Sequence, residues 1–220
     1  MQEKEWILFD FDGTLFDTKE GVAKCTQHAL RAFGIEEPDW RTMDFMVGPP
    51  LDYSFKNHYG FSEEDAKKAV DLYRVRYLEK GVYECSPYPG ITEALTNLRE
   101  KGYKIGVASS KPEKLCDAIL KNHGLRQLFD DVCGADEETG RSEKRDVLLE
   151  ALRRMGYGVD ASLAVLVGDT VFDVKGASEL SMDCIAVSYG FGDVAEMEKA
   201  GAVAVLGSLR EVNEFFEGKV

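Results

Sequence analysis

Two carboxylates only two residues apart follow the first apolar run of this 220-residue chain. The run WILF at residues 6–9 leads directly into DFDGT at residues 10–14, which contains Asp10 and Asp12. A buried parallel strand that ends in acid places it at the carboxyl edge of the sheet, where open α/β sheets bind ligands. Because carboxylates this close repel each other, the pair favours a bound cation, a shared proton or both. A solvated acidic turn is the simpler alternative.

Three more polar segments follow apolar runs further along the chain. Ser109 and Ser110 precede Lys111-Pro112, and a hydroxyl with free amides at a helix start suits a phosphate-sized anion. Lys144 begins a helical pattern, and GDTVFD at residues 168–173 carries two acids four residues apart. Each has an ordinary explanation taken alone, as a helix cap, a solvated lysine or an acidic turn. Together they can converge at one edge of a single sheet.

The elements that would position these groups alternate between strands and helices. Short apolar runs, typical of strands buried on both faces, predict six strands, at residues 6–11, 104–109, 131–134, 163–168, 183–188 and 202–206. Apolar stripes predict helices between them, one beginning near Gly90 and one over residues 145–155. Strand–helix alternation with right-handed crossovers predicts an α/β fold with a doubly wound parallel, Rossmann-like sheet.

The alternation of predicted strands and helices is interrupted after the first strand. Residues 17–86 contain no convincing strand and have helical patterns, including a capping signal at Ser62. We therefore predict an inserted all-α domain over residues 17–86, with the catalytic core formed by residues 1–16 and 87–220. An insertion leaving the acidic strand end is expected to lie over that site, close on a substrate and exclude water. A purely structural accessory lobe is the alternative.

Composition limits the classes of partner and location. The net charge of −13 argues against a nucleic-acid groove, which needs clustered Lys and Arg. The apolar runs are too short to span a bilayer, and residues 1–5 (MQEKE) do not resemble a signal peptide. Five widely spaced cysteines without a C-x-x-C pair predict reduced thiols, with neither a disulfide framework nor a zinc site. We expect a cytoplasmic protein without a membrane partner, as monomer or homodimer.

Two further motifs are weaker candidates. CTQHALR at residues 25–31 matches the Cys-x5-Arg spacing of cysteine-dependent phosphatases, but it lacks phosphate-wrapping glycines and lies in a helical pattern. GFGDVA at residues 190–195 matches a dinucleotide fingerprint, but too little chain follows it for the required second strand and acid. We predict a helix for the first motif and a sharp turn for the second.

The four polar segments together resemble the haloacid dehalogenase-like hydrolase superfamily. That family's pattern is D-x-D-G-T, then a strand ending in Ser or Thr, then a Lys, then G-D-x-x-x-D. All four motifs occur here in order: DFDGT at residues 10–14, Ser109, Lys144 and GDTVFD at residues 168–173. The insertion is similar to the C1-type cap of that family. GPPL at residues 48–51 and GRSEK at residues 140–144 favour the phosphoglycolate phosphatase and 5′-nucleotidase-like branch.

The resemblance implies roles for five residues. Asp10 would attack phosphorus and form an aspartyl-phosphate, which divides hydrolysis into two steps. Asp12 would protonate the leaving oxygen and later take a proton from the attacking water. Ser109, the Ser110 amide and Lys144 would hold the phosphoryl oxygens.

It also implies a Mg²⁺ cofactor, whose preferred ligands are oxygens. The expected ligands are the side chains of Asp10 and Asp169 and the backbone carbonyl of Asp12. Asp173 would bind the ion either directly or through water. The ion would let an anionic nucleophile approach an anionic phosphate.

The expected function is hydrolysis of a small phosphorylated metabolite by a Mg²⁺-dependent, phosphoglycolate phosphatase-like enzyme. Alternatives on the same site are a 5′-nucleotidase, a protein-tyrosine phosphatase and a sugar-phosphate mutase similar to β-phosphoglucomutase. A receiver-like signalling domain is disfavoured by chain length and by a nucleophile on the first strand. A dehalogenase is disfavoured because Asp12 would have no leaving oxygen to protonate.

Overall fold

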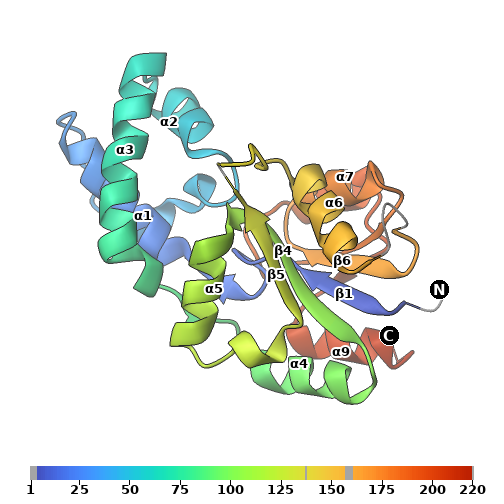
Figure 1. Cartoon of the computed structure of the whole chain (residues 1–220). Helices are drawn as coiled ribbons and strands as arrows, with labels where there is room; N and C mark the ends of the chain where they lie inside the picture. The colour runs from blue at the N-terminus through green and yellow to red at the C-terminus, as the bar shows by residue number, and fades with distance from the viewer. Residues whose placement is uncertain (1–3, 137, 157–160, 220) are drawn as a thin grey trace. The chain divides into compact units, whose positions relative to one another are not determined.

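The structure is a computed structural model that describes residues 4–136, 138–156 and 161–219 (Figure 1). The chain divides into two compact units. Residues 1–16 and 87–220 form the first, called here the core unit, and residues 17–86 form the second, called the helical unit. All predicted site residues lie in the core unit, so this unit is the one that positions the candidate chemistry.

A six-stranded parallel sheet forms the centre of the core unit, in the order β5-β4-β1-β6-β7-β8. Its strands are β1 (Trp6–Phe9), β4 (Lys104–Pro112), β5 (Asp131–Ala135), β6 (Ala164–Gly168), β7 (Asp183–Val187) and β8 (Ala204–Leu206). The predicted doubly wound α/β fold is confirmed, and all six predicted strands are present. Strand β1 ends at Phe9, before the acidic motif, so both acids lie in the loop that follows it.

Helices cover both faces of this sheet. They are α4 (Ile91–Glu100), α5 (Glu113–Asn122), α6 (Lys144–Arg154), α7 (Val171–Ser178), α8 (Val194–Ala200) and α9 (Leu209–Phe216), with a 3₁₀ turn η4 (Arg126–Leu128). Helices α6 and α7 lie on one face, and α4 and α9 on the other (Figure 1). Side chains alternate along a strand, so Trp6 and Leu8 point to the α6–α7 face and share a buried cluster with Val147 and Val174.

The helical unit contains α1 (Lys19–Arg31), α2 (Leu51–Tyr59), α3 (Glu63–Glu79) and the 3₁₀ turns η1 (Trp40–Thr42), η2 (Asp44–Met46) and η3 (Gly81–Tyr83). As its sequence predicts, Ser62 caps α3, because its side chain accepts a hydrogen bond from the Asp65 amide. Tyr73 and Tyr77 are buried and stacked, with ring centroids 5.4 Å apart. The CTQHALR segment lies within α1, as predicted.

The strands β2 (Phe16–Asp17) and β3 (Ser86–Pro87) lie where the chain passes from one unit to the other, and they form a two-stranded sheet. None of the helices in the described part of the chain is long and apolar enough to span a bilayer.

Candidate active site

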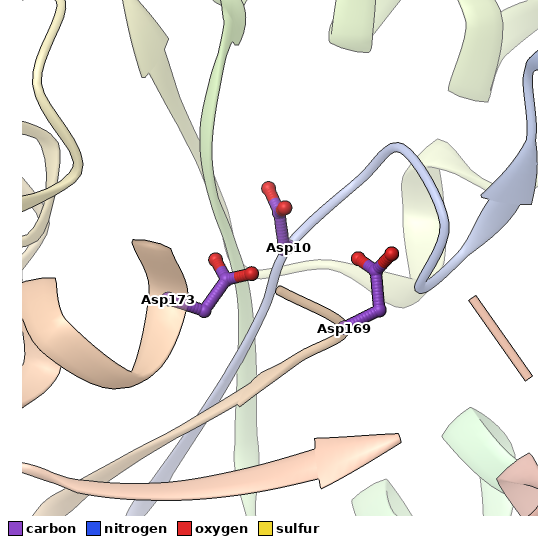
Figure 2. A group of neighbouring side chains, drawn as sticks. All are labelled: Asp10, Asp169 and Asp173. Carbon is purple, nitrogen blue, oxygen red and sulfur yellow. The ribbon is translucent and has the colours of Figure 1, made fainter. Parts of the chain in front are cut away.

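Three aspartates from separate segments meet at the carboxyl edge of the sheet. Asp10 follows β1, Asp169 follows β6, and Asp173 lies in the first turn of α7. Strands β1 and β6 are paired neighbours, which brings the first two together. One carboxylate oxygen from each residue lies within 4.8 Å of the others, and all three residues are buried (Figure 2). The structure therefore brings together three of the four carboxyl residues that the sequence predicts for this site.

Asp169 is held by both flanking loops. The Thr14 hydroxyl donates to its Oδ1 at 2.9 Å, and the Phe191 amide donates to its Oδ2 at 2.9 Å. The hydrogen bond from the Phe191 amide requires the backbone at Gly190 to lie close to the Asp169 side chain. Only glycine permits this approach, because a Cβ on Gly190 would lie 2.3 Å from the Asp169 Cβ. Residues 190–192 thus form a bend that orients a site carboxylate, as predicted, and α8 begins at Val194.

Asp173 uses its two carboxylate oxygens for different purposes. Its Oδ2 accepts hydrogen bonds from the Thr170 amide at 3.0 Å and the Thr170 hydroxyl at 2.8 Å, which forms a capping box at the start of α7. Its Oδ1 lies 2.8 Å from the Lys144 ammonium. The four-residue spacing in GDTVFD therefore serves the helix cap and the site together.

Lys144 begins α6 and is buried among these acids. Its Nζ lies 2.8 Å from Asp10 Oδ1 and 2.8 Å from Asp173 Oδ1, and it donates to the Ala108 carbonyl at 3.0 Å. Burial alone would lower the pKa of Lys144, but Asp10 and Asp173 outweigh it and raise the pKa above its ordinary value. The lysine therefore stays cationic at physiological pH.

The site has more negative than positive charge. Burial, followed by the charges of Asp173 and Asp10, raises the pKa of Asp169 well above its ordinary value. Burial and the charge of Asp10 also raise the pKa of Asp173, although Lys144 opposes them. Three buried carboxylates against one ammonium form a donor set suited to a hard divalent cation, which would compensate the remaining charge. These residues fit the predicted metal site.

The serine segment lies on the strand beside β1. Strand β4 pairs regularly with β5 as far as Ser109, and the register then shifts before Pro112 pairs with Ala135. The strand thus extends to Pro112, three residues beyond the prediction, and Pro112 is the N-cap of α5. Ser109 is buried, whereas Ser110 is exposed. Both serines lie near the end of β4, the strand that pairs with β1, which leads to Asp10.

Lys111 is a site residue that the sequence reasoning missed. Its Nζ lies 3.0 Å from Oδ1 and 3.2 Å from Oδ2 of Asp12, and its side chain is buried. The available signal was side-chain alternation, because a residue two positions beyond Ser109 on an extended strand points to the same side. The structure thus assigns an ion-pair partner to the predicted acid–base residue.

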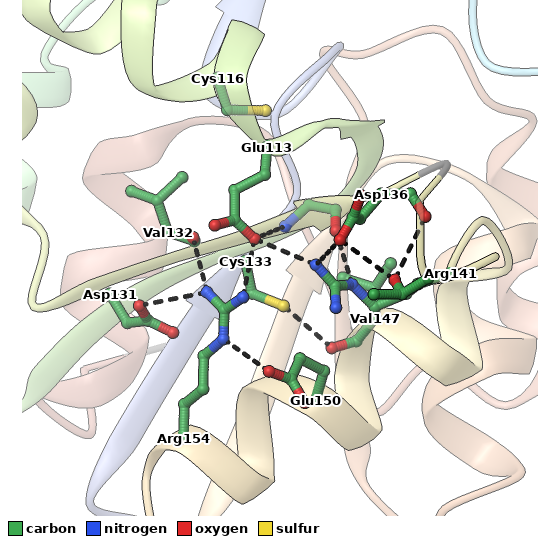
Figure 3. Close-up of polar contacts among 12 residues, drawn as sticks. Glu113, Cys116, Asp131, Val132, Cys133, Asp136, Arg141, Val147, Glu150 and Arg154 are labelled. Atoms are coloured by element: carbon green, nitrogen blue, oxygen red, sulfur yellow. Dashed lines mark hydrogen bonds and ion pairs between the residues drawn. The ribbon is translucent and has the colours of Figure 1, made fainter.

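A second group of charged side chains lies at β5, and we call it the β5 ion network (Figure 3). Glu113 Oε2 accepts from Arg141 at 3.2 Å and from Arg154 at 2.9 Å. Arg154 also donates to Glu150 at 2.9 Å, and its Nη1 lies 3.6 Å from Asp131 Oδ1. The network joins the start of α5, strand β5 and helix α6. Through Arg141 and Glu113 it connects the segment that leads into Lys144 with the start of α5, the helix that follows the serine segment.

A family model described as haloacid dehalogenase-like hydrolase matches residues 7–187. The chain belongs to this family. The matched range contains every predicted site residue, from Asp10 to Asp173. A crystal structure of a predicted phosphatase from Clostridium acetobutylicum has a TM-score of 0.91 and 34% identity, covering 99% of this chain and all of that chain.

Relatives of this hydrolase carry different names. A 5′-nucleotidase from Pseudomonas aeruginosa is 36% identical over 211 residues, which is 94% of this chain and 95% of that protein. The tyrosine-protein kinase PtkA from Mycobacterium tuberculosis is 32% identical over 204 residues, which is 93% of this chain and 69% of that protein. A phosphoglycolate phosphatase from Nitrosococcus oceani is 26% identical over 218 residues, with 96% of both chains covered.

Proposed function

We propose that this hydrolase is a Mg²⁺-dependent phosphatase that cleaves small phosphate monoesters through an aspartyl-phosphate on Asp10. The observation that carries the proposal is the buried group of Asp10, Asp169, Asp173 and Lys144 at one edge of the sheet. The Asp10 carboxylate lies beside the Lys144 ammonium and two further acids. This arrangement suits attack on a phosphate, because the acids can hold a cation and the ammonium can hold an anionic group. The relatives named as nucleotidase and phosphatase support the same reaction class.

The acids would hold the metal ion. We assign Asp10, Asp169 and the backbone carbonyl of Asp12 as ligands, with Asp173 either as a further ligand or as a residue that contacts a metal-bound water. When bound, Mg²⁺ supplies positive charge that allows the anionic nucleophile and phosphate to approach. The fixed orientation of Asp169 by Thr14 and Phe191 supports its role, because ligand carboxylates need such outer contacts.

In the first step, a carboxylate oxygen of Asp10 attacks phosphorus and the bond from phosphorus to the ester oxygen breaks. The leaving oxygen takes a proton from the Asp12 carboxyl and departs as an alcohol. In the second step, water attacks phosphorus, its proton passes to Asp12, and the bond from phosphorus to Asp10 breaks. Asp10 returns as carboxylate, and inorganic phosphate is the second product.

The remaining polar groups would bind the transferring phosphoryl group. Lys144 contributes a permanent positive charge beside Asp10, as its pKa shift indicates. Ser109 would donate its hydroxyl and Ser110 its amide to phosphoryl oxygens. These donors are strongest in the transition state, where charge on the equatorial oxygens changes.

Substrate choice is assigned to the helical unit, which we propose to be a C1-type cap. Phosphoglycolate and nucleoside 5′-monophosphates are the first small metabolites to consider, because relatives carry those names. A phosphotyrosine substrate or transfer to a sugar phosphate would use the same Asp10 chemistry. All five cysteines are free thiols and four are buried, which supports a reducing compartment such as the cytoplasm.

A phosphate-release assay over a metabolite panel, ranked by kcat/KM, tests the proposal. The panel contains phosphoglycolate, nucleoside monophosphates, sugar phosphates and a phosphotyrosine peptide, each assayed with Mg²⁺ and with a chelator. We expect one class of monoester to be preferred and turnover to stop with the chelator. Turnover that is indifferent to the chelator would remove the metal assignment. Consumption of a sugar phosphate without phosphate release would favour the mutase.

A further inference from the structure

The Lys111–Asp12 pair is unusual because a buried cation joins the end of one strand to the loop that follows another. The lysine lies near the end of β4 and the aspartate follows β1, 99 positions apart in the chain. Only 5% of the Lys111 side chain is exposed, against 24% for Asp12. Taking an ammonium out of water costs free energy unless a nearby partner compensates. The compensation comes from both oxygens of one carboxylate, at 3.0 and 3.2 Å.

Other contacts fix the lysine at both of its ends. Its backbone amide donates to the Ser109 hydroxyl oxygen at 3.2 Å, and its ammonium lies 5.8 Å from the centre of the Phe11 ring. The backbone end is therefore set by the serine that we assign to the phosphate. The charged end is set beside the carboxyl that we assign to proton transfer. A single residue, through its backbone and its side chain, therefore contacts both functional groups.

We propose that Lys111 is a positioning residue that holds the Asp12 carboxyl in the orientation needed to protonate the leaving oxygen. The proposal rests on the proposed function, in which Asp12 serves that role. Asp12 lies in a loop, and a loop carboxyl has rotational freedom unless a partner restricts it. Holding a reacting group near its working geometry removes an orientational cost from the chemical step. The structure supplies this restraint through two short contacts to a single ammonium.

The leaving group provides the discriminating measurement. Nitrophenolate departs readily without a proton, whereas an alkoxide needs one, so misplacing the acid affects the alkyl ester more. In Lys111→Met, kcat/KM for glycerol phosphate is expected to fall by about 10- to 100-fold. For nitrophenyl phosphate we expect a loss of only about 3-fold. Lys111→Arg keeps the charge and is expected to recover part of the lost activity toward glycerol phosphate.

Two further variants separate positioning from other roles. In an Asp12→Asn background, Lys111→Met should have no further effect on either substrate, because the group that it positions is gone. Lys114→Met is the matched control, since Lys114 lies in the first turn of α5, three residues after Lys111, with 93% of its side chain exposed. This control is expected to match the wild type on both esters.

Two results would overturn the proposal. One is an equal loss of kcat/KM on both esters in Lys111→Met, and the other is an undiminished loss when the same substitution is made in the Asp12→Asn background. Either result would indicate that Lys111 binds the phosphate itself. Thermal unfolding of each variant shows whether a loss reflects folding. If Lys111→Met does not fold, the leaving-group comparison is made with Lys111→Arg, and equal losses would again reject the role. Failure of the proposed function has a separate signature, because the wild type would then release no phosphate from either ester.

Discussion

The active-site edge and the β5 ion network use the same types of charged residue in opposite ways. At the active site, three buried carboxylates share one ammonium, that of Lys144. In the network, two arginines, Arg141 and Arg154, contact four carboxylates, and the side chains stay partly exposed, at 26% for Arg154 and 33% for Glu113. Water therefore still reaches the charges of the network, whereas the active-site charges are buried and need compensation by a ligand.

This difference assigns the two regions different tasks. Partly hydrated ion pairs cost little free energy to form and can hold elements together. An unbalanced buried group destabilises the fold until a ligand compensates it, and such groups are typical of functional sites. The raised pKa values of Asp169 and Asp173 express this imbalance. Substitutions in the two regions should therefore separate activity from stability.

The largest expected effect is on turnover in Asp10→Asn. Removing the nucleophile should lower kcat by at least about 1,000-fold. The fold should be retained, because an amide can replace the carboxylate beside Lys144 while removing one of three buried negative charges. Phosphate release and thermal unfolding in chelator measure the two properties. A variant with normal turnover would exclude Asp10 as the nucleophile.

Binding of Mg²⁺ should stabilise the wild type more than a variant that lacks one ligand. At a concentration of about 100 times Kd, the ion is expected to add about 2–3 kcal/mol to the free energy of unfolding. Asp169→Asn should lose most of this gain, whereas Glu138→Gln, an 84% exposed acid, should keep it. Denaturant unfolding with and without Mg²⁺ provides the comparison. Equal stabilisation of all three proteins would place the ion elsewhere.

In the network, Arg154→Met should reduce stability and leave the chemistry intact. It removes contacts to Glu113, Glu150 and the Val132 carbonyl, at an expected cost of about 1–3 kcal/mol. Arg153→Met is the matched control, because Arg153 lies beside Arg154, contacts Glu150 and is 70% exposed. Urea unfolding and kcat/KM are measured on both. A large loss of kcat/KM in folded Arg154→Met would erase the proposed distinction between the regions.

The smallest effect concerns Cys133, which donates to the Val147 carbonyl within the network. Burial raises its pKa to about 12, so the folded protein keeps the thiol protonated when an unfolded thiol, with a pKa of about 8.5, has ionised. Its contribution to stability is thus complete below about pH 8.5 and declines as the pH rises above that value. Thiol titration at pH 8 should modify the half-buried Cys85 before Cys133. Rapid modification of Cys133 in folded protein would contradict this burial.

Much of the core unit was predictable because its signals are local. Each parallel strand is a short apolar run, and the acids and serines directly follow such runs, so strand order alone brings Asp10 and Asp169 to one edge. The capping signal at Ser62 was equally local. Strand ends were less accurate, since the register shift after Ser109 extends β4 to Pro112 and depends on pairing with β5.

The contacts that orient the site could not be predicted in the same way. The hydrogen bond from the Phe191 amide to Asp169 joins residues 22 positions apart through a turn, and Lys111 meets Asp12 across 99 positions. A lysine in sequence is solvated by default, so its burial becomes visible only when two strand ends are placed side by side. Tertiary placement, and not residue type, determined these partners.

The most direct test of the account is chemical mapping of the phosphorylated residue. Protein quenched in acid during turnover is treated with borohydride, which reduces an aspartyl-phosphate to homoserine, and peptides are analysed by mass spectrometry. We predict homoserine at position 10 in the wild type and none in Asp10→Asn. Homoserine at another aspartate, or an unmodified Asp10 under conditions where the intermediate accumulates, would contradict covalent catalysis by this residue.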